Sequence, residues 1–228
     1  MNQECSCDKC ELKELFFHNV TSKEIMSLCG SRVEKNYDKG DCIIEQGTTI
    51  NEFIYLKSGL VKLYVTNTDG KEQILSFAKP FDFVSLLSVF SQNTYSYSVM
   101  AIDESTTCNI SIHDVKKLLQ NNGPFAMGIL EKMSKVSDAV INESLQIRKR
   151  NLRGRIAYVL LHFRNDIYNS DYYELPVSRK EIAEYIGMTT ENVIRALTEF
   201  RKDGIIKIFG KAIEIVSYKK LVQISEHG

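Results

Sequence analysis

The chain has 228 residues, of which 43% are hydrophobic and 25% charged, the ordinary balance of a soluble globular protein with one or two domains. No apolar run approaches the roughly 18 residues of a membrane-spanning helix, and the polar start MNQECSCDKC lacks a signal-peptide core, so we expect a cytoplasmic protein without a membrane partner. Disulfides are rare in the cytosol, and the six cysteines are therefore expected to be free, metal-bound or redox-active.

The overall net charge of zero hides an asymmetry between the two parts of the chain. Residues 1–144 hold 14 Lys and Arg against 19 Asp and Glu, whereas residues 145–228 hold 15 against 10. The resulting charges of −5 and +5 suggest that the C-terminal part meets a polyanion, although chance variation between two solvated surfaces would look the same.

The chain begins with three cysteines in a segment that is too short and polar to bury them. Cys5 and Cys7 lie on the same side of an extended segment, and a turn can bring Cys10 alongside. Cys29 and Cys42 are isolated from the other cysteines, so we expect both to be buried as small hydrophobic residues, the commoner fate of an isolated cysteine.

Residues 33–112 show the pattern of β-structure. Short apolar runs are separated by turn residues, and Gly40, Gly47, Gly59 and Gly70 recur at spacings of 7, 12 and 11. Asp69-Gly70 between two such runs is a strong hairpin signal. The pattern predicts a β-roll of roughly eight strands.

A helical period begins at Gly123-Pro124, where proline suits a first turn. An apolar stripe with 4-3-4-7 spacing follows, interrupted by Glu143 at the skipped position, and consists of Ile129, Met133, Val136, Val140 and Ile147. Such a narrow stripe is typical of a seam between two helices, which predicts a homodimer. The alternative is a helix that packs on its own domain.

Residues 146–155 form a basic, polar break that we interpret as a hinge into a second domain. After a helix and a connector, Ser178 and Glu181 form a capping box, and Gly187 is expected to end that helix in the left-handed conformation. Thr189 can cap a second helix, and two alternating strands around residues 209–211 follow it. This arrangement predicts a winged helix-turn-helix.

Four residues of the second helix lie off its apolar stripe, namely Thr190, Glu191, Ile194 and Arg195. Arginine can bind O6 and N7 of guanine, and glutamate can accept from the cytosine amino group, so Glu191 and Arg195 are candidates for base contacts. A simple surface ion pair between them is the alternative. Candidate phosphate contacts are Arg179, Lys180 and Lys211.

This order of a β-roll, a long helix and a winged helix-turn-helix resembles the Crp/Fnr transcription regulators, and SRKEIAEYIGMTTENVIRAL is the most specific part of the match. The resemblance covers nearly the whole chain and implies an α+β fold. It implies a sensory β-roll of the cyclic-nucleotide-binding, jelly-roll type with a cysteine-rich arm (1–122), a dimerisation helix (123–147) and a winged helix-turn-helix domain (148–228). It also implies a homodimer on double-stranded DNA, with RNA polymerase as a further partner.

In that family, the residues matching Glu191 and Arg195 contact a G·C-containing core of each palindromic half-site. Ile194 departs from the Ser or Gly often found at its position, and an apolar side chain there could touch a thymine methyl group. The operator is therefore expected to be close to the known family sites without being the same.

Family members that bind cyclic AMP hold its phosphate with a Glu and an Arg-Ser pair. The matching positions here are Leu86 and Tyr95-Ser96, and residues 80–115 contain no Lys or Arg. A buried cyclic phosphate would lack its strongest charge-assisted hydrogen bonds, so we expect no cyclic AMP.

In the oxygen-sensing Fnr branch, N-terminal cysteines and one internal cysteine hold an iron–sulfur cluster. The resemblance places Cys108 at the internal position and Cys7 and Cys10 in a Cys-x-x-Cys pair, with Cys5 as the remaining ligand because the family's next cysteine corresponds to Phe16. Four thiolates also suit zinc, and a thiol–disulfide switch stays open. Haem, with His18 as an axial ligand, and a small molecule in the β-roll are the remaining candidates for the effector.

Two other classes of protein are considered. An enzyme is not expected, because the four histidines show no metal-ligand spacing and no phosphate loop, nucleophile elbow or paired-carboxylate motif is present. The second class is a module that regulates protein partners without touching DNA. In that case Glu191→Ala and Arg195→Ala would leave operator binding unchanged.

Overall fold

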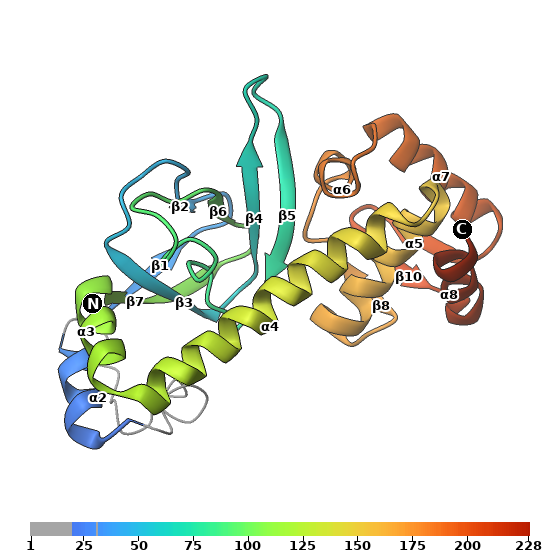
Figure 1. Ribbon diagram of the computed structural model, residues 1–228. Coiled ribbons are helices and arrows are strands. Elements are labelled where there is room, and N and C mark those ends of the chain that lie inside the picture. Colours follow the sequence, from blue (N-terminus) through green and yellow to red (C-terminus); the bar gives the residue numbers. More distant parts are fainter. Residues whose placement is uncertain (1–19, 31) are drawn as a thin grey trace. The chain divides into compact units, whose positions relative to one another are not determined.

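The computed structural model describes residues 20–30 and 32–228, which form two compact units. The first unit contains the described residues up to Thr66 together with Phe77–Val140, and the second contains Asn67–Ser76 and Ile141–Gly228. Helix α4 (Gly123–Arg148) contributes residues to both units (Figure 1).

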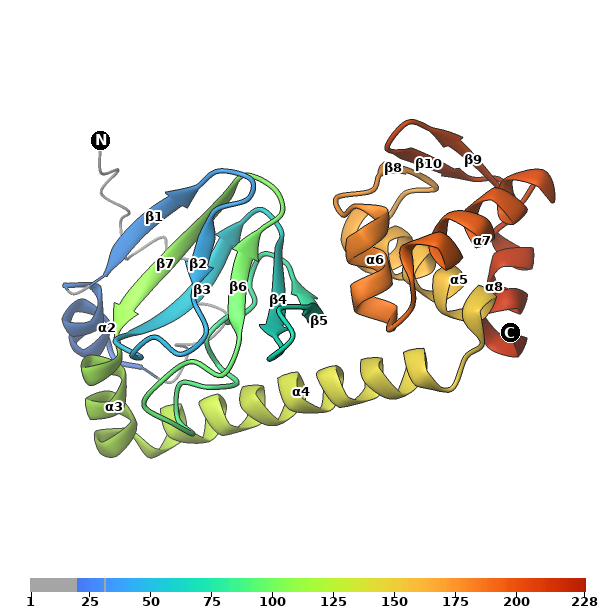
Figure 2. The same ribbon diagram turned by 90° about the horizontal axis from the view of Figure 1, so that it is seen from above.

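Two antiparallel sheets make up the β-roll (Figure 2). One sheet has the strand order β1-β7-β3 and the other β2-β6-β4-β5. The strands are β1 (Val33–Tyr37), β2 (Cys42–Ile44), β3 (Glu52–Ser58), β4 (Val61–Thr66), β5 (Glu72–Ala78), β6 (Ser98–Ala101) and β7 (Ser105–Ser111). The predicted β-roll is confirmed, with these seven strands among the described residues where roughly eight were expected.

The predicted turn chemistry explains how the strands connect. Gly70 closes the β4–β5 hairpin with φ of 77°, and Asn67 donates its amide to the Lys71 carbonyl at 2.9 Å. Gly59 links β3 to β4 with φ of 91°, where an added Cβ would lie 2.6 Å from the Cα of Ser105. Only glycine fits this position without moving the neighbouring strand.

The core of the β-roll is built on β3. The Phe83 ring centroid lies 4.7 Å from that of Phe53 and 5.6 Å from that of Tyr55, and Leu56 is fully buried. Because side chains alternate along a strand, β3 buries side chains on both of its faces.

The first unit also contains the helices α2 (Ser22–Cys29) and α3 (Ile112–Asn121). The sequence pattern did not predict α3. The side chain of Asn122 then accepts the Phe125 amide at 2.9 Å, which caps the first turn of α4 where Gly123-Pro124 predicted a helix to begin.

The second unit is a helical domain with a small sheet. Its elements are α5 (Leu152–His162), a π-helical turn η2 (Phe163–Tyr168), β8 (Tyr172–Glu174), α6 (Arg179–Ile186), α7 (Thr190–Lys202), β9 (Ile206–Phe209), β10 (Ala212–Ile215) and α8 (Tyr218–His227). The strand order is β8-β10-β9, so the predicted β9–β10 hairpin gains a third strand that was not expected. In the part of the chain that the structure describes, no helix combines the length and hydropathy that a membrane crossing needs.

Candidate nucleic-acid interface

Helix α6 begins with the predicted capping box. The Glu181 amide donates to the Ser178 hydroxyl at 3.2 Å, and the Glu181 carboxylate accepts the Ser178 amide at 2.8 Å. Two amides that no helical carbonyl could reach are thereby satisfied, which explains why the helix starts at Arg179.

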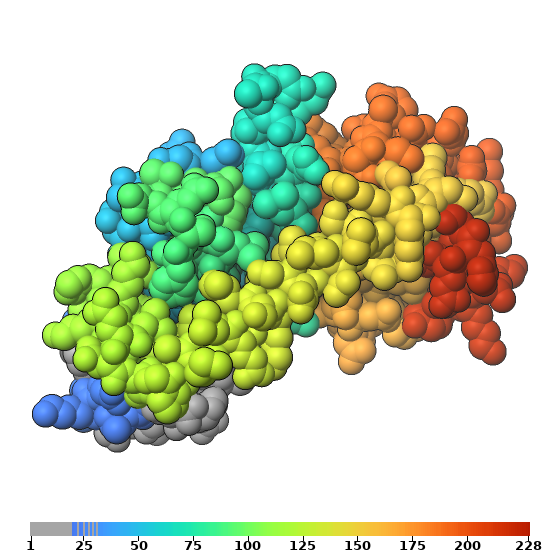
Figure 3. Space-filling model, in the orientation of Figure 1, coloured from blue at the N-terminus to red at the C-terminus, as the bar shows by residue number. Residues whose placement is uncertain are grey.

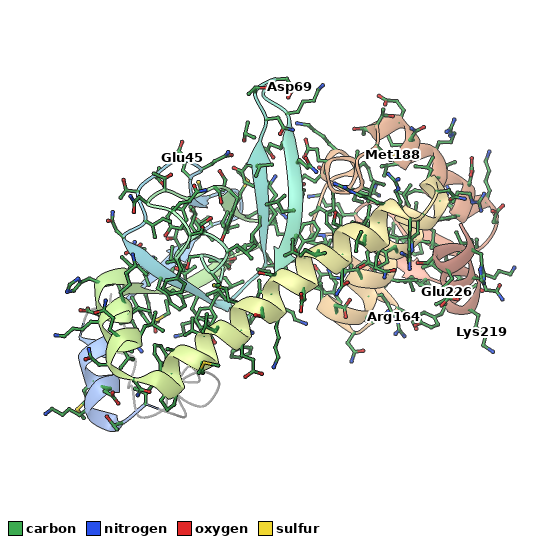
Figure 4. All side chains as sticks on the ribbon, in the orientation of Figure 1. Glu45, Asp69, Arg164, Met188, Lys219 and Glu226 are labelled. Carbon is green, nitrogen blue, oxygen red and sulfur yellow. The ribbon has the colours of Figure 1, made fainter. Side chains whose placement is uncertain are left out.

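The turn between α6 and α7 depends on Gly187. Its φ of 67° is left-handed, and the amides of Gly187 and Met188 both donate to the Ala183 carbonyl. Thr189 follows in an extended conformation, and its hydroxyl accepts the Asn192 amide at 3.4 Å (Figure 4 labels Met188 in this turn). The predicted helix-turn-helix is confirmed residue by residue.

Helix α7 buries one face and exposes the other. The buried stripe consists of Val193, Ala196, Leu197 and Phe200, as predicted. Glu191 and Arg195 are exposed, Ile194 keeps 52% of its surface exposed, and Thr190 is half-buried. Three of the four predicted base-reading positions are therefore open to a ligand.

The two candidate base-reading residues are not paired with each other. Arg195 donates through Nη2 to the Asn192 side chain at 3.0 Å, and no ion pair joins it to Glu191 among the described residues. The amide of Glu191 itself and the Thr189 hydroxyl lower the pKa of the Glu191 carboxyl below its ordinary value. Glu191 is therefore an anion at neutral pH, ready to accept hydrogen bonds.

Three cations expected at phosphates lie around this helix. Lys180 has 78% of its side chain exposed and lies 3.5 Å from the Glu184 carboxylate, and Lys211 is exposed just after Gly210 in the β9–β10 turn. Arg179 is only half-buried, and burial lowers the pKa of its guanidinium. Lys180 and Lys211 are thus the more accessible of the three.

The basic segment interpreted as a hinge, residues 146–155, makes several contacts within the second unit. Arg150 lies with its guanidinium 4.7 Å from the Tyr158 ring centroid and donates to the Ser225 carbonyl at 2.6 Å. Arg155 donates to the Arg150 carbonyl within the segment and to the Ile186 carbonyl on α6, each at 2.9 Å. Composition alone gave no sign of these contacts, since a basic polar run is equally typical of a solvated linker.

The predicted metal ligands lie only partly within the described residues. Cys5, Cys7 and Cys10, like His18 and the side chain of Cys29, lie outside them. Cys108 is 1% exposed in β7 and is paired in register with Glu34 and Tyr55. Within residues 20–30 and 32–228, no three His, Cys, Asp or Glu side chains come together as a possible metal site.

Cys42 is exposed, so the prediction that it is buried was wrong: β2 is a short strand with an irregular register against β6.

The positions that would hold a cyclic phosphate are occupied by packed side chains. Leu86 is 1% exposed and Tyr95 5%. The Tyr95 hydroxyl donates to the Glu52 carbonyl at 3.0 Å, and the hydroxyls of Ser96 and Ser88 lie 2.6 Å apart.

The stripe predicted as the dimer seam of α4 is partly used within the chain. Ile129 and Ile147, at its two ends, are 4% and 6% exposed. The large apolar side chains of α4 that are open to solvent lie on another face of the helix, and they are Met127, Leu130, Ile141 and Leu145. Ile129 and Ile147 are thus buried within the chain itself, and heptad spacing does not distinguish such packing from contact with a partner helix. Figure 3 shows the uncovered surface of α4 in yellow-green to yellow.

Comparisons with known protein families match both parts of the chain. Residues 34–122 match the model of the cyclic nucleotide-binding domain, and residues 154–224 match that of the Crp-like helix-turn-helix domain.

Individual proteins match over nearly the full length. The transcriptional activator protein Anr of Pseudomonas aeruginosa is 26% identical, with 96% of this chain and 92% of the relative covered. The anaerobic regulatory protein of Haemophilus influenzae is 24% identical, with coverages of 96% and 87%. A solved transcriptional regulator of the Crp/Fnr family from Eubacterium rectale superposes with a TM-score of 0.80 at 19% identity, covering 96% of this chain and 99% of that one, which shows that the fold is shared.

Proposed function

The chain belongs to the Crp/Fnr family of transcription regulators, and from that premise we propose that it binds a palindromic operator as a homodimer. The observation that carries this proposal is the exposed face of α7, where Glu191 and Arg195 stand unpaired with each other beside the apolar Ile194. Arg195 suits guanine and Glu191 suits cytosine, so each half-site is expected to contain a G·C pair. Lys180 and Lys211 would hold the flanking phosphates.

The dimer would form along α4. Its exposed apolar side chains recur on one face, whereas half-exposed Met133, Val136 and Val140 lie on the predicted seam. A second copy would remove these side chains from water and place two recognition helices about 34 Å apart, in successive major grooves. A twofold dimer also matches a palindromic site.

We propose that the signal is oxygen, nitric oxide or redox state, sensed through an iron–sulfur cluster on Cys5, Cys7, Cys10 and Cys108. Support comes from relatives named as anaerobic regulators and from a thiol at Cys108 that is held inside β7. Cys108 belongs to no group of three or more His, Cys, Asp or Glu side chains among the described residues, so the N-terminal arm would have to supply the other thiolates. When bound, a cluster would supply an oxygen-sensitive centre.

The alternative is that the cysteines hold no cluster and that haem or a small molecule in the β-roll is the effector. Cyclic AMP is not proposed, because the phosphate-binding Glu and Arg are replaced by Leu86 and Tyr95, both packed in the core. We further propose that the protein acts in the cytoplasm, without catalysis of its own, and that RNA polymerase is its partner at promoters.

Purification without oxygen tests the sensor. The proposal predicts a broad visible absorption band with near-stoichiometric iron and acid-labile sulfide, lost in air and in Cys108→Ala but kept in Cys42→Ala, which changes an exposed cysteine outside the proposed set. A Soret band would replace the cluster with haem. A colourless protein that still binds DNA would overturn the cluster and favour a small molecule or a thiol switch.

A further inference from the structure

Glu143 is a carboxylate on a face of α4 that is otherwise apolar. Its side chain is 11% exposed. The Tyr185 hydroxyl on α6 donates to its Oε1, and the Ser76 hydroxyl on β5 donates to its Oε2 at 2.8 Å. All three residues belong to the second unit.

A third element approaches the same carboxylate from α5. His162 Nε2 lies 3.9 Å from Glu143 Oε1, and His162 Nδ1 lies 2.9 Å from the Asp166 carboxylate. His162 Nε2 is buried and has no hydrogen-bond partner within the described part of the chain. The residue is stacked on Tyr158, at a centroid distance of 6.5 Å. Residues of α5, α6 and β5 thus converge on one buried acidic group.

Burial makes this group sensitive to its partners. A carboxylate removed from water is costly unless hydrogen bonds replace its hydration, and here hydroxyl groups supply them. Tyr185 is itself 6% exposed, and burial together with the Glu143 charge raises its pKa well above the ordinary value. The tyrosine therefore remains a neutral donor, and a shift of α6 along α4 would deprive the buried carboxylate of one of its two hydroxyl donors.

The next residue of α6 is tied to the end of α4 as well. Arg155 donates to the Ile186 carbonyl at 2.9 Å and to the carbonyl of Arg148, the last residue of α4, at 3.4 Å. Tyr185 and Ile186 directly precede Gly187, and α7 begins at Thr190. The hydrogen bonds of the Tyr185 hydroxyl and the Ile186 carbonyl therefore hold the last turn of α6, immediately before the turn that leads into the recognition helix.

We propose that Glu143 is a positioning residue for DNA binding: by holding the Tyr185 hydroxyl, it sets the orientation of the helix-turn-helix on the last turns of α4. This inference rests on the proposed operator binding and extends it to a residue that does not touch DNA. Glu143 interrupts the apolar stripe of α4 because a carboxylate is needed there.

The experiment uses the full-length protein and compares wild type with Tyr185→Phe, Glu143→Leu and Glu143→Gln. Tyr173→Phe is the matched control, since Tyr173 is also buried in the second unit but donates to the Leu160 carbonyl, at 2.7 Å, rather than to Glu143. Affinity for the duplex selected by the wild type is measured by fluorescence anisotropy. Hydrogen–deuterium exchange of residues 179–189 is followed without DNA.

Tyr185→Phe and Glu143→Leu are expected to weaken operator binding about tenfold and to speed exchange in residues 179–189, because each removes a hydrogen bond to a buried charge or leaves a hydroxyl unpaired. Glu143→Gln keeps an acceptor oxygen and should restore most of both properties. Tyr173→Phe should leave exchange in this segment unchanged. A purely structural role would make Tyr185→Phe and Tyr173→Phe alike.

Wild-type exchange and affinity in both Tyr185→Phe and Glu143→Leu would overturn the inference. If the wild type selects no duplex, the proposed operator binding fails. The exchange data then test the positioning role of the Glu143–Tyr185 hydrogen bond on their own. Faster exchange of residues 179–189 in Tyr185→Phe but not in Tyr173→Phe would support this role, and equal exchange in the two variants would overturn it.

Discussion

Arg153 on α5 is joined to Glu199 on α7, with its Nη1 3.0 Å from the Glu199 carboxylate. The other terminal nitrogen lies 2.9 Å from Asp203, and the guanidinium lies 5.1 Å from the ring centroid of Phe200. A planar guanidinium that binds two carboxylates and covers a ring fixes the C-terminal half of α7 on α5. The exposed N-terminal half of α7, with Glu191 and Arg195, therefore belongs to a helix whose other half is fixed on α5.

The base-reading residues should affect specificity. We expect Arg195→Ala and Glu191→Ala each to reduce operator affinity by about 1–3 kcal/mol and to relax the preference at one base pair, because each removes contacts to a base edge. Anisotropy titrations on the operator and on single-base variants measure this. Arg201→Ala, an exposed arginine at the end of α7, is the control. An equal loss on every sequence would make Arg195 a phosphate contact instead.

The cations around α7 should affect the salt dependence of binding. Removing a phosphate contact lowers the slope of log K against log salt by about 1, or about 2 for a dimer. We expect this of Lys180→Ala and Lys211→Ala, and a smaller change for half-buried Arg179→Ala. Lys219→Ala on α8, which Figure 4 labels, should leave the slope unchanged. Unchanged slopes in all variants would remove these residues from the interface.

Replacing the turn glycine, Gly187, should destabilise the protein. Gly187→Ala places a side chain in the left-handed region, which costs about 1–2 kcal/mol, although nothing lies within 4 Å of the added Cβ. Gly128 lies inside α4 with equally open surroundings, and Gly128→Ala should stabilise by about 0.5–1 kcal/mol. Chemical denaturation of both variants gives the two signs. A stabilising Gly187→Ala would contradict the turn geometry.

The exposed face of α4 should carry the dimer. Ile141→Asp or Leu145→Asp is expected to weaken dimerisation by at least about 100-fold, because a twofold interface carries the new charge twice and buries it. Asn142→Asp adds the same charge at an exposed neighbouring position and should have a much smaller effect. Sedimentation equilibrium measures the dissociation constants. Wild-type dimerisation of both Ile141→Asp and Leu145→Asp would place the interface elsewhere.

Elements set by local chemistry were predictable from the sequence. The capping box at Ser178, the left-handed Gly187 and the cap at Thr189 all depend on contacts within a few residues, and each occurs as predicted. Strand β8 was missed because it has three residues and exists through pairing with β10, where Tyr173 lies opposite Ile213. Helix α8 likewise packs against α5, with Leu221 fully buried, a contact between distant segments.

The site shows the same limit. The exposed positions of α7 followed from its period, whereas the free face of α4 did not, because burial of Ile129 and Ile147 depends on tertiary packing. The hydrogen-bond partners of Glu143 and Arg155 on α6 come from segments far away in the chain, and no local sequence pattern predicts them.

Selection of binding sites from a random duplex library tests the central claim most directly. The anaerobically purified protein is expected to enrich a palindrome whose half-sites contain a G·C pair and lie one helical turn apart, and Arg195→Ala should lose the preference at that pair. If no sequence is enriched over the starting library, or if Arg195→Ala enriches the same palindrome, sequence reading by α7 is contradicted.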